Sequence, residues 1–144
     1  MLNVFKKFSV RPVGIVHIGA HQCEEYSMYK DDGKCDNILW IEANPELVDM
    51  NKQFDIYQAV ISDTTGTEVE FIVTNNIQSS SFLELKDHLI EHPDVHEQKR
   101  IRLTTTTFVD FVRTWNIDCA SYDFLAMDIQ GAELHALRGM GNLI

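Results

Sequence analysis

Three acidic residues follow three short apolar runs and carry the clearest chemical signal in the chain. The acids are Glu42, Asp63 and Asp128, and they follow the runs 38–41, 56–61 and 122–127. Such runs are typical of buried strands, and in open α/β sheets ligands bind at the carboxyl ends of the strands. A carboxylate there can accept hydrogen bonds from two neighbouring hydroxyl groups, although each acid could equally cap the helix that follows its strand.

A glycine ends a further apolar run. Residues 15–18 precede Gly19, and residues 22–30 contain many helix formers, so we expect a buried strand that turns sharply into a helix. The glycine lets the backbone approach a ligand without a Cβ, and the start of the helix would offer unpaired amide donors. Glu42 follows Gly19 at close to the roughly 20-residue offset of an acid that binds ribose hydroxyls. Together they indicate a nucleoside-containing cofactor.

The first half of the chain predicts the sheet that would hold these residues. Expected strands at 15–18, 38–41 and 56–61 alternate with expected helices at 22–30 and 45–54. This βαβαβ order gives a parallel sheet with right-handed crossovers. We therefore predict an α/β fold with helices on both faces of the sheet.

The pattern changes in the second half. Residues 67–73 alternate between polar and apolar after a turn at Gly66, which predicts a half-exposed strand that could pair with a strand at 99–105. A polar loop is expected at 75–81, and 83–93 is ambiguous between a helical turn and a loop. The remaining expected elements are a helix at 108–115, a strand at 122–127, and a helix that starts at 131 and breaks near Gly139 and Gly141.

Length and composition predict one ordinary globular domain. The chain has 144 residues, of which 44% are hydrophobic and 24% are charged. We expect residues 1–12 to form a lead-in with a short amphipathic helix and residues 13–144 to form the domain. The net charge of −10 argues against nucleic acid as a partner, since binding to duplex backbones needs a basic stripe.

Cysteine use and hydropathy predict a cytoplasmic protein. The three cysteines are an odd set without a CxxC spacing, which favours reduced thiols over a disulfide framework or a zinc site. No apolar run reaches the roughly 18 residues of a membrane span, and the N-terminus lacks the apolar region of a signal peptide. We therefore expect no membrane partner.

Five ordered segments resemble the motifs of FkbM-type methyltransferases, and the resemblance extends from residue 13 to the last residue. The Asp-Ile-Gln-Gly-Ala-Glu segment at 128–133 is the most diagnostic, since it resembles the Asp-Val-Glu-Gly-Ala-Glu of the family. The other segments are 17–21, 40–45, 59–63 and 106–110. The resemblance implies a class I, Rossmann-like fold and S-adenosyl-L-methionine as cofactor. It also implies a small-molecule or glycan acceptor, and we expect O-methylation of one of its hydroxyls.

The resemblance also assigns site residues. The Gly19 turn would hold the methionine part of the cofactor, Glu42 the ribose, and Asp63 the adenine, while Asp128 would lie near the sulfonium and the acceptor. Asp128 and Glu133 are the candidates for helping to deprotonate the acceptor hydroxyl. The full set of expected cofactor-binding residues is His17, Gly19, Ala20, His21, Glu42, Ala43, Ile61, Ser62, Asp63 and Asp128.

Some positions depart from the family pattern. Cys23 stands where the family often has a second glycine, His17 replaces the more usual Asp, and Gln130 replaces an acid. We interpret His17 and His21 as buried or capping residues rather than catalytic bases. His88, His92 and His96 recur every four residues, but Pro93 interrupts a helix that would align them, so no metal is expected. The serines at 79–81 resemble a small polar segment that lies near the cofactor in the family.

Two other functions remain open on the sequence. A nicotinamide-dependent oxidoreductase would also use the glycine turn and Glu42, although the full Gly-x-Gly-x-x-Gly pattern is absent. The third possibility is a non-catalytic cofactor-binding or assembly module. Class I methyltransferases add further strands after the helix that here begins at 131, so the sheet should be truncated after its fourth parallel strand. A longer parent protein, a covering second subunit in a homo-oligomer, or a shortened chain that binds the cofactor without turnover would each account for this.

Overall fold

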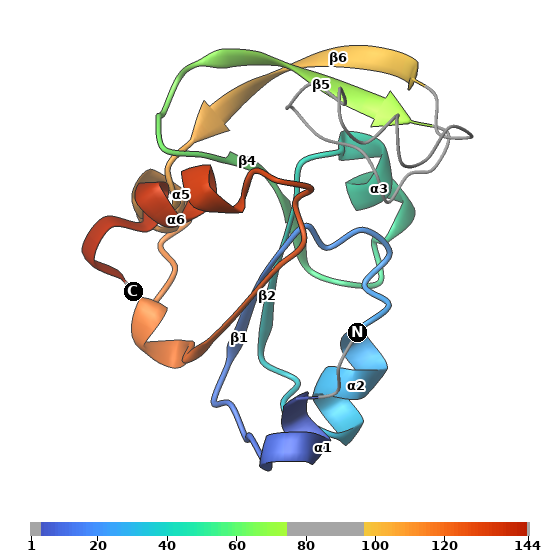
Figure 1. Cartoon of the computed structure of the whole chain (residues 1–144), viewed down its shortest axis with the longest axis vertical. Coiled ribbons are helices and arrows are strands. Elements are labelled where there is room, and N and C mark those ends of the chain that lie inside the picture. Colours follow the sequence, from blue (N-terminus) through green and yellow to red (C-terminus); the bar gives the residue numbers. More distant parts are fainter. Residues whose placement is uncertain (1–3, 75–96, 144) are drawn as a thin grey trace.

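The computed structural model describes residues 4–74 and 97–143, which form two sheets with helices packed around them (Figure 1). The helices are α1 (Val4–Phe8), α2 (Tyr26–Asp31), α3 (Pro45–Met50), α5 (Phe108–Thr114) and α6 (Glu133–Met140), with short 3₁₀ turns at Cys119–Ser121 and Gly141–Leu143. The strands are β1 (Ile15–Ile18), β2 (Ile38–Glu42), β3 (Ile56–Gln58), β4 (Val60–Ile61), β5 (Glu68–Thr74), β6 (Glu97–Thr106) and β7 (Phe124–Met127). No helix in the described ranges is long and apolar enough to cross a membrane. The expected loop and ambiguous segment within 75–93, Ser79–Ser81 and the three recurring histidines lie outside the described residues.

The main sheet is fully parallel and has the order β3-β2-β1-β7. Strands β1 and β2 lie in its centre and are almost entirely buried, as continuous apolar runs predict for a sheet covered on both faces. Alternate side chains of β1 pack into two hydrophobic cores on opposite faces of the sheet. Val16 and Ile18 pack with α5 and α6 on one face, while Ile15 packs with α1 and α2 on the other. The molecule is therefore an α/β, Rossmann-like fold, as predicted.

The expected strand 56–61 is two strands in different sheets. The amide of Ala59 donates to the carbonyl of Glu42, after which Val60 and Ile61 leave the main sheet and pair in parallel with β6. Strand β6 also pairs antiparallel with β5, which confirms the predicted pairing of the 67–73 and 99–105 segments. The second sheet consequently has the order β4-β6-β5.

The lead-in is part of the domain core. The predicted short helix exists as α1, and its Phe5 is only 1% exposed. The Phe5 ring packs against Tyr29 of α2 and Phe124 of β7, with ring centroids 5.7 and 5.2 Å away. Figure 1 shows α1 and α2 together at the same end of the molecule. Helix α1 therefore packs against the same core as α2 and β7.

Two helix boundaries differ from the prediction for local backbone reasons. Helix α2 begins at Tyr26 instead of residue 22, because His21 and Cys23 have φ angles of 47° and 57° that a helix cannot contain. Helix α6 begins at Glu133 instead of residue 131, because Gln130 and Gly131 have φ angles of 54° and 95°, and it ends at Met140, near Gly139 and Gly141 as predicted. A Cβ on Gly139 would lie 1.9 Å from the carbonyl oxygen of Ser62, so this glycine allows close packing within the helix.

Candidate functional site

The carboxyl ends of β1, β2 and β7 bring three of the expected site residues together. The amide of Gly19 donates to the carbonyl of Ile41 at 2.9 Å, and the amide of Asp128 donates to the carbonyl of Ile18 at 3.0 Å. The turns that start at Gly19, Glu42 and Asp128 are therefore neighbours at one edge of the main sheet. This is the edge at which open α/β sheets bind ligands.

Position 19 requires glycine because the backbone that follows the neighbouring strand β7 lies too close for a side chain. Its φ is 90°, and a Cβ would lie 2.1 Å from the carbonyl oxygen of Asp128. The sequence argument assigned the missing Cβ to the approach of a ligand. The structure instead fills that space with the β7 backbone, so the glycine allows β1 and β7 to end side by side.

The expected unpaired amides of this turn are absent. The amides of Gly19 and Ala20 both donate to the Ile41 carbonyl, and the amide of Cys23 donates to the Ala20 carbonyl. The amides of residues 21 and 22 donate to the side chains of Glu42 and Glu24. The expectation failed because this segment is a sequence of tight turns rather than the first turn of a helix. Its amides are therefore not available to a ligand.

Glu42 joins the turns that follow β1 and β2. It is only 6% exposed, and its two carboxylate oxygens accept hydrogen bonds of 2.8 Å from the amides of His21 and Asn44. Burial raises the pKa of Glu42, while these two hydrogen bonds act to lower it. Each carboxylate oxygen keeps a further lone-pair direction for another donor.

His21 is fixed at both its backbone and its ring. Its carbonyl accepts a hydrogen bond of 3.1 Å from the side-chain amide of Asn51, and its Nδ1 lies 2.6 Å from Oε1 of Glu24. Partial burial acts to raise the pKa of Glu24, but hydrogen bonds from its own amide, His21 and Gln22 lower it on balance. The sequence argument did not single out Glu24, although its spacing of three residues from His21 is a usable signal.

His17 lies beneath this edge. Its side chain is 1% exposed, its Nδ1 is 2.8 Å from the hydroxyl of Tyr29, and its ring centroid is 4.9 Å from that of Trp40. Burial lowers the pKa of His17 to about 4, although a hydrogen bond with the Gly19 backbone acts to raise it. The ring is consequently neutral at physiological pH and lies buried beneath the turn.

The edge is strongly acidic. Burial, together with the charges of Glu24 and Asp128, raises the pKa of Glu25. These charges act on one another because the β1 and β7 turns are adjacent. With Glu42, this part of the chain gathers four carboxyl groups, an arrangement that favours a cationic ligand.

The turn after β7 is held by its own side chains. The side-chain amide of Gln130 donates to Oδ1 of Asp128 at 3.0 Å, and Oε1 of Glu133 accepts from the amide of Ile129 at 3.1 Å. Gln130 and Gly131 have φ angles of 54° and 95°. Glu133 therefore has a structural role in this turn, and Asp128 lies nearer to the β1 turn.

Asp63 belongs to a second group of residues, between β4 and α6. Its Oδ2 lies 2.9 Å from Nδ1 of His135, and this hydrogen bond lowers the pKa of Asp63. Ile61 and Ser62 beside it are buried. The sequence argument missed His135, because nothing local in the sequence links two residues that far apart.

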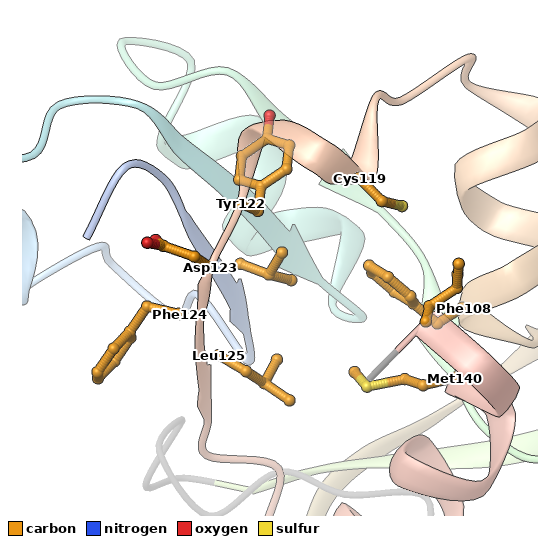
Figure 2. Close-up of a pocket in the computed structure, with 9 residues that line it drawn as sticks. Phe108, Cys119, Tyr122, Asp123, Phe124, Leu125 and Met140 are labelled. Carbon is orange, nitrogen blue, oxygen red and sulfur yellow. The ribbon is translucent and has the colours of Figure 1, made fainter.

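A cavity of about 290 Å³ lies apart from both groups, against the face of β7 (Figure 2). Its lining includes Val16, Phe108, Leu125 and Met140, and Figure 2 shows Leu125 and Met140 pointing toward one another across it. This lining is mostly apolar and contains none of the expected site residues. The acidic edge, and not this cavity, is therefore the candidate cofactor site.

The family model described as "Methyltransferase FkbM domain" matches residues 16–144. No curated protein and no solved structure matches the chain. The match covers all the residues described above at the acidic edge. It favours the methyltransferase interpretation of the glycine turn and Glu42 over the nicotinamide alternative.

Proposed function

Because this chain belongs to the FkbM methyltransferase family, we propose that it transfers a methyl group from S-adenosylmethionine to a hydroxyl group of a small molecule or a sugar. The observation that carries this proposal is the acidic edge around Glu42, formed by the turns after β1, β2 and β7.

The residues at this edge fit the chemistry of that cofactor. S-adenosylmethionine carries a sulfonium, an ammonium group and a ribose diol, all of which prefer acceptors or negative charge. The amides of the turn after β1 are already used, and Glu24, Glu25 and Asp128 supply negative charge nearby. Glu42 keeps free lone pairs for ribose hydroxyls.

Each expected residue then has a role that agrees with its position. Glu42 accepts a hydrogen bond from the ribose, and the backbone of Gly19, Ala20 and His21 forms the wall of the cofactor site. Ala43 continues this wall after β2. The buried His17 supports the wall without touching the cofactor, since its ring nitrogens bond to Tyr29 and to the Gly19 backbone.

Asp63 and its neighbours Ile61 and Ser62 hold the adenine. The exocyclic amine of adenine is a donor, and the carboxylate of Asp63 is only partly used by His135 and Ser62. His135 thereby becomes part of the adenine side of the site.

Asp128 is the group that removes the proton from the acceptor. The cofactor supplies a methyl carbon already activated by its sulfonium, so the chain mainly has to align the acceptor oxygen with that carbon. Asp128 stands at the end of β7 beside Gly19, where its carboxylate can accept the hydroxyl proton. Glu133 acts through the turn, because its carboxylate already holds the Ile129 amide.

Calorimetric titration of the purified chain with S-adenosylhomocysteine tests the proposal, with NADH titrated in parallel. We expect saturable binding of S-adenosylhomocysteine and none of NADH. A well-folded sample that binds NADH, or that binds neither ligand, would contradict the proposed function.

A further inference from the structure

The ring of His21 contains an atom that the proposed roles leave unexplained. Within residues 4–74 and 97–143, Nε2 of His21 is the single buried side-chain nitrogen or oxygen without a hydrogen-bond partner. Buried polar atoms are nearly always paired, and an exception needs a physical reason. A ligand group that completes the pairing is one such reason.

The hydrogen bonds of the ring determine what kind of ligand group fits. The carboxylate of Glu24 can only accept, so Nδ1 of His21, at 2.6 Å from it, carries the hydrogen. In the neutral ring Nε2 is then an acceptor. The missing partner of the neutral ring is therefore a donor, such as a hydroxyl or an amine hydrogen.

The backbone of His21 indicates which donor this is. Its amide donates to Oε2 of Glu42, the carboxylate to which the proposed function assigns the ribose, and its carbonyl is held by Asn51. The turn that carries the His21 ring is thus hydrogen-bonded to the Glu42 carboxylate. A ribose brings two neighbouring hydroxyl donors, and this turn has two acceptors.

We propose that Nε2 of His21 accepts a hydrogen bond from a ribose hydroxyl of the cofactor, and that Glu24 is a positioning residue that keeps Nε2 in its acceptor form. The inference rests on the proposed function. Because Nε2 is buried in this structure, the proposal requires the His21 ring to become accessible when the cofactor binds. Glu24 can fix the ring because its carboxylate contacts both Nδ1 of His21 and the amide of Gln22.

Two substitutions separate this binding role from a structural one. His21→Asn keeps an amide donor near the position of Nδ1, where it can still bond to Glu24, but it has no acceptor at the position of Nε2. His21→Gln can place an acceptor near the position of Nε2, but it has no donor at the position of Nδ1. The φ of His21 is 47°, a conformation that Asn tolerates better than Gln. A purely structural role would make His21→Asn the better variant in both stability and ligand affinity.

We expect the two measurements to rank the variants in opposite order. His21→Asn should have the higher melting temperature but bind S-adenosylhomocysteine roughly three- to tenfold more weakly than the wild type, the usual effect of one lost hydrogen bond. His21→Gln should bind more tightly than His21→Asn. If His21→Asn binds as tightly as a binding-competent wild type, this inference fails and the proposed function stands. If the wild type itself does not bind, both fail.

Cofactor analogues identify which ribose hydroxyl the His21 ring contacts. S-adenosylhomocysteine is compared with its 2′-deoxy and 3′-deoxy forms on the wild type and on His21→Asn. The loss caused by His21→Asn should vanish for the one analogue that lacks the bonded hydroxyl. A loss that persists with both analogues would overturn the ribose assignment.

Nitrogen NMR of the His21 ring tests the role of Glu24. In the wild type, Nε2 should give the signal of an unprotonated ring nitrogen and should shift when S-adenosylhomocysteine binds. Glu24→Ala should allow the hydrogen to move to Nε2 and should weaken binding, while Glu70→Ala, at an exposed position of β5, should change neither. An unchanged protonation pattern in Glu24→Ala would contradict the positioning role.

Discussion

Gly19 is the most constrained residue of the candidate site. Its positive φ and its contact with the Asp128 carbonyl would both oppose any side chain. We expect Gly19→Ala to lower the free energy of unfolding by about 2 kcal/mol or more, because a backbone atom cannot move aside as a flexible side chain can. Urea denaturation measures this change.

Gly66→Ala is the matched control for Gly19→Ala. Gly66 has a φ of 85°, similar to the 90° of Gly19, but no atom would lie within 4 Å of its Cβ. Gly66→Ala should therefore lower the free energy of unfolding only through the strained backbone conformation, by about 1 kcal/mol. Equal losses in the two variants would show that contact with β7 does not determine the glycine at position 19.

His17 should make the stability of the chain depend on pH. Its pKa is about 4 in the folded chain and 6.5 in the unfolded chain, so below pH 6.5 the unfolded state takes up a proton first. The contribution of His17 to the free energy of unfolding is fully present above pH 6.5. It is lost as the pH falls from 6.5 toward 4, by about 3 kcal/mol in total.

The His17→Gln variant isolates this effect from the titration of the carboxylates. The difference in unfolding free energy between the wild type and His17→Gln, measured by denaturant titration from pH 4 to pH 8, should be constant above pH 6.5 and change below it. A difference that stays flat across the whole range would show that the folded chain binds this proton as easily as the unfolded chain does.

Helix α6 shows packing prevailing over helix propensity. Alanine is a better helix former than glycine by about 1 kcal/mol, so propensity alone predicts that Gly139→Ala stabilises the chain. The Cβ would lie 1.9 Å from the Ser62 carbonyl oxygen, so we expect a loss of at least 2 kcal/mol by thermal or urea unfolding. Arg138→Ala, at an exposed position of the same helix, should change stability by less than about 0.5 kcal/mol. A stabilised Gly139→Ala would mean that α6 does not pack this closely on β4.

The main elements could be predicted because their signals are local. Continuous apolar runs identified β1, β2 and β7, and polar–apolar alternation identified the β5–β6 pair. The division of 56–61 between two sheets could not be predicted, because it depends on the hydrogen bond from Ala59 to Glu42 and on pairing with the distant β6. The early part of the expected α2 was lost to left-handed residues that are not glycine, which sequence patterns rarely reveal.

The candidate site was predictable in part for the same reason. Glu42 and Asp128 stand at strand ends, a position that hydropathy reveals, and the structure places both beside Gly19. Three other features of the site could not be predicted. They are the hydrogen bonds that use up the amides of the turn, the contact of Glu24 with His21, and the pairing of Asp63 with His135. Each depends on side-chain geometry that exists only in the folded chain.

For the whole molecule, cofactor binding should appear as added stability. A ligand that binds only the folded state at about 100 times its Kd contributes about 2.7 kcal/mol, which corresponds to a rise in melting temperature of roughly 5–10 °C for a chain of this size. S-adenosylhomocysteine should raise the melting temperature of the wild type and of Glu70→Gln alike. Glu42→Gln should show a much smaller rise, and an undiminished rise would remove Glu42 from the site.

A crystal structure of the chain with S-adenosylhomocysteine tests the central claim most directly. We predict a ribose hydroxyl within hydrogen-bond distance of the Glu42 carboxylate, with the adenosyl group over the turns that follow β1 and β2. An adenosyl group seated in the apolar cavity against β7, away from Gly19 and Glu42, would contradict it.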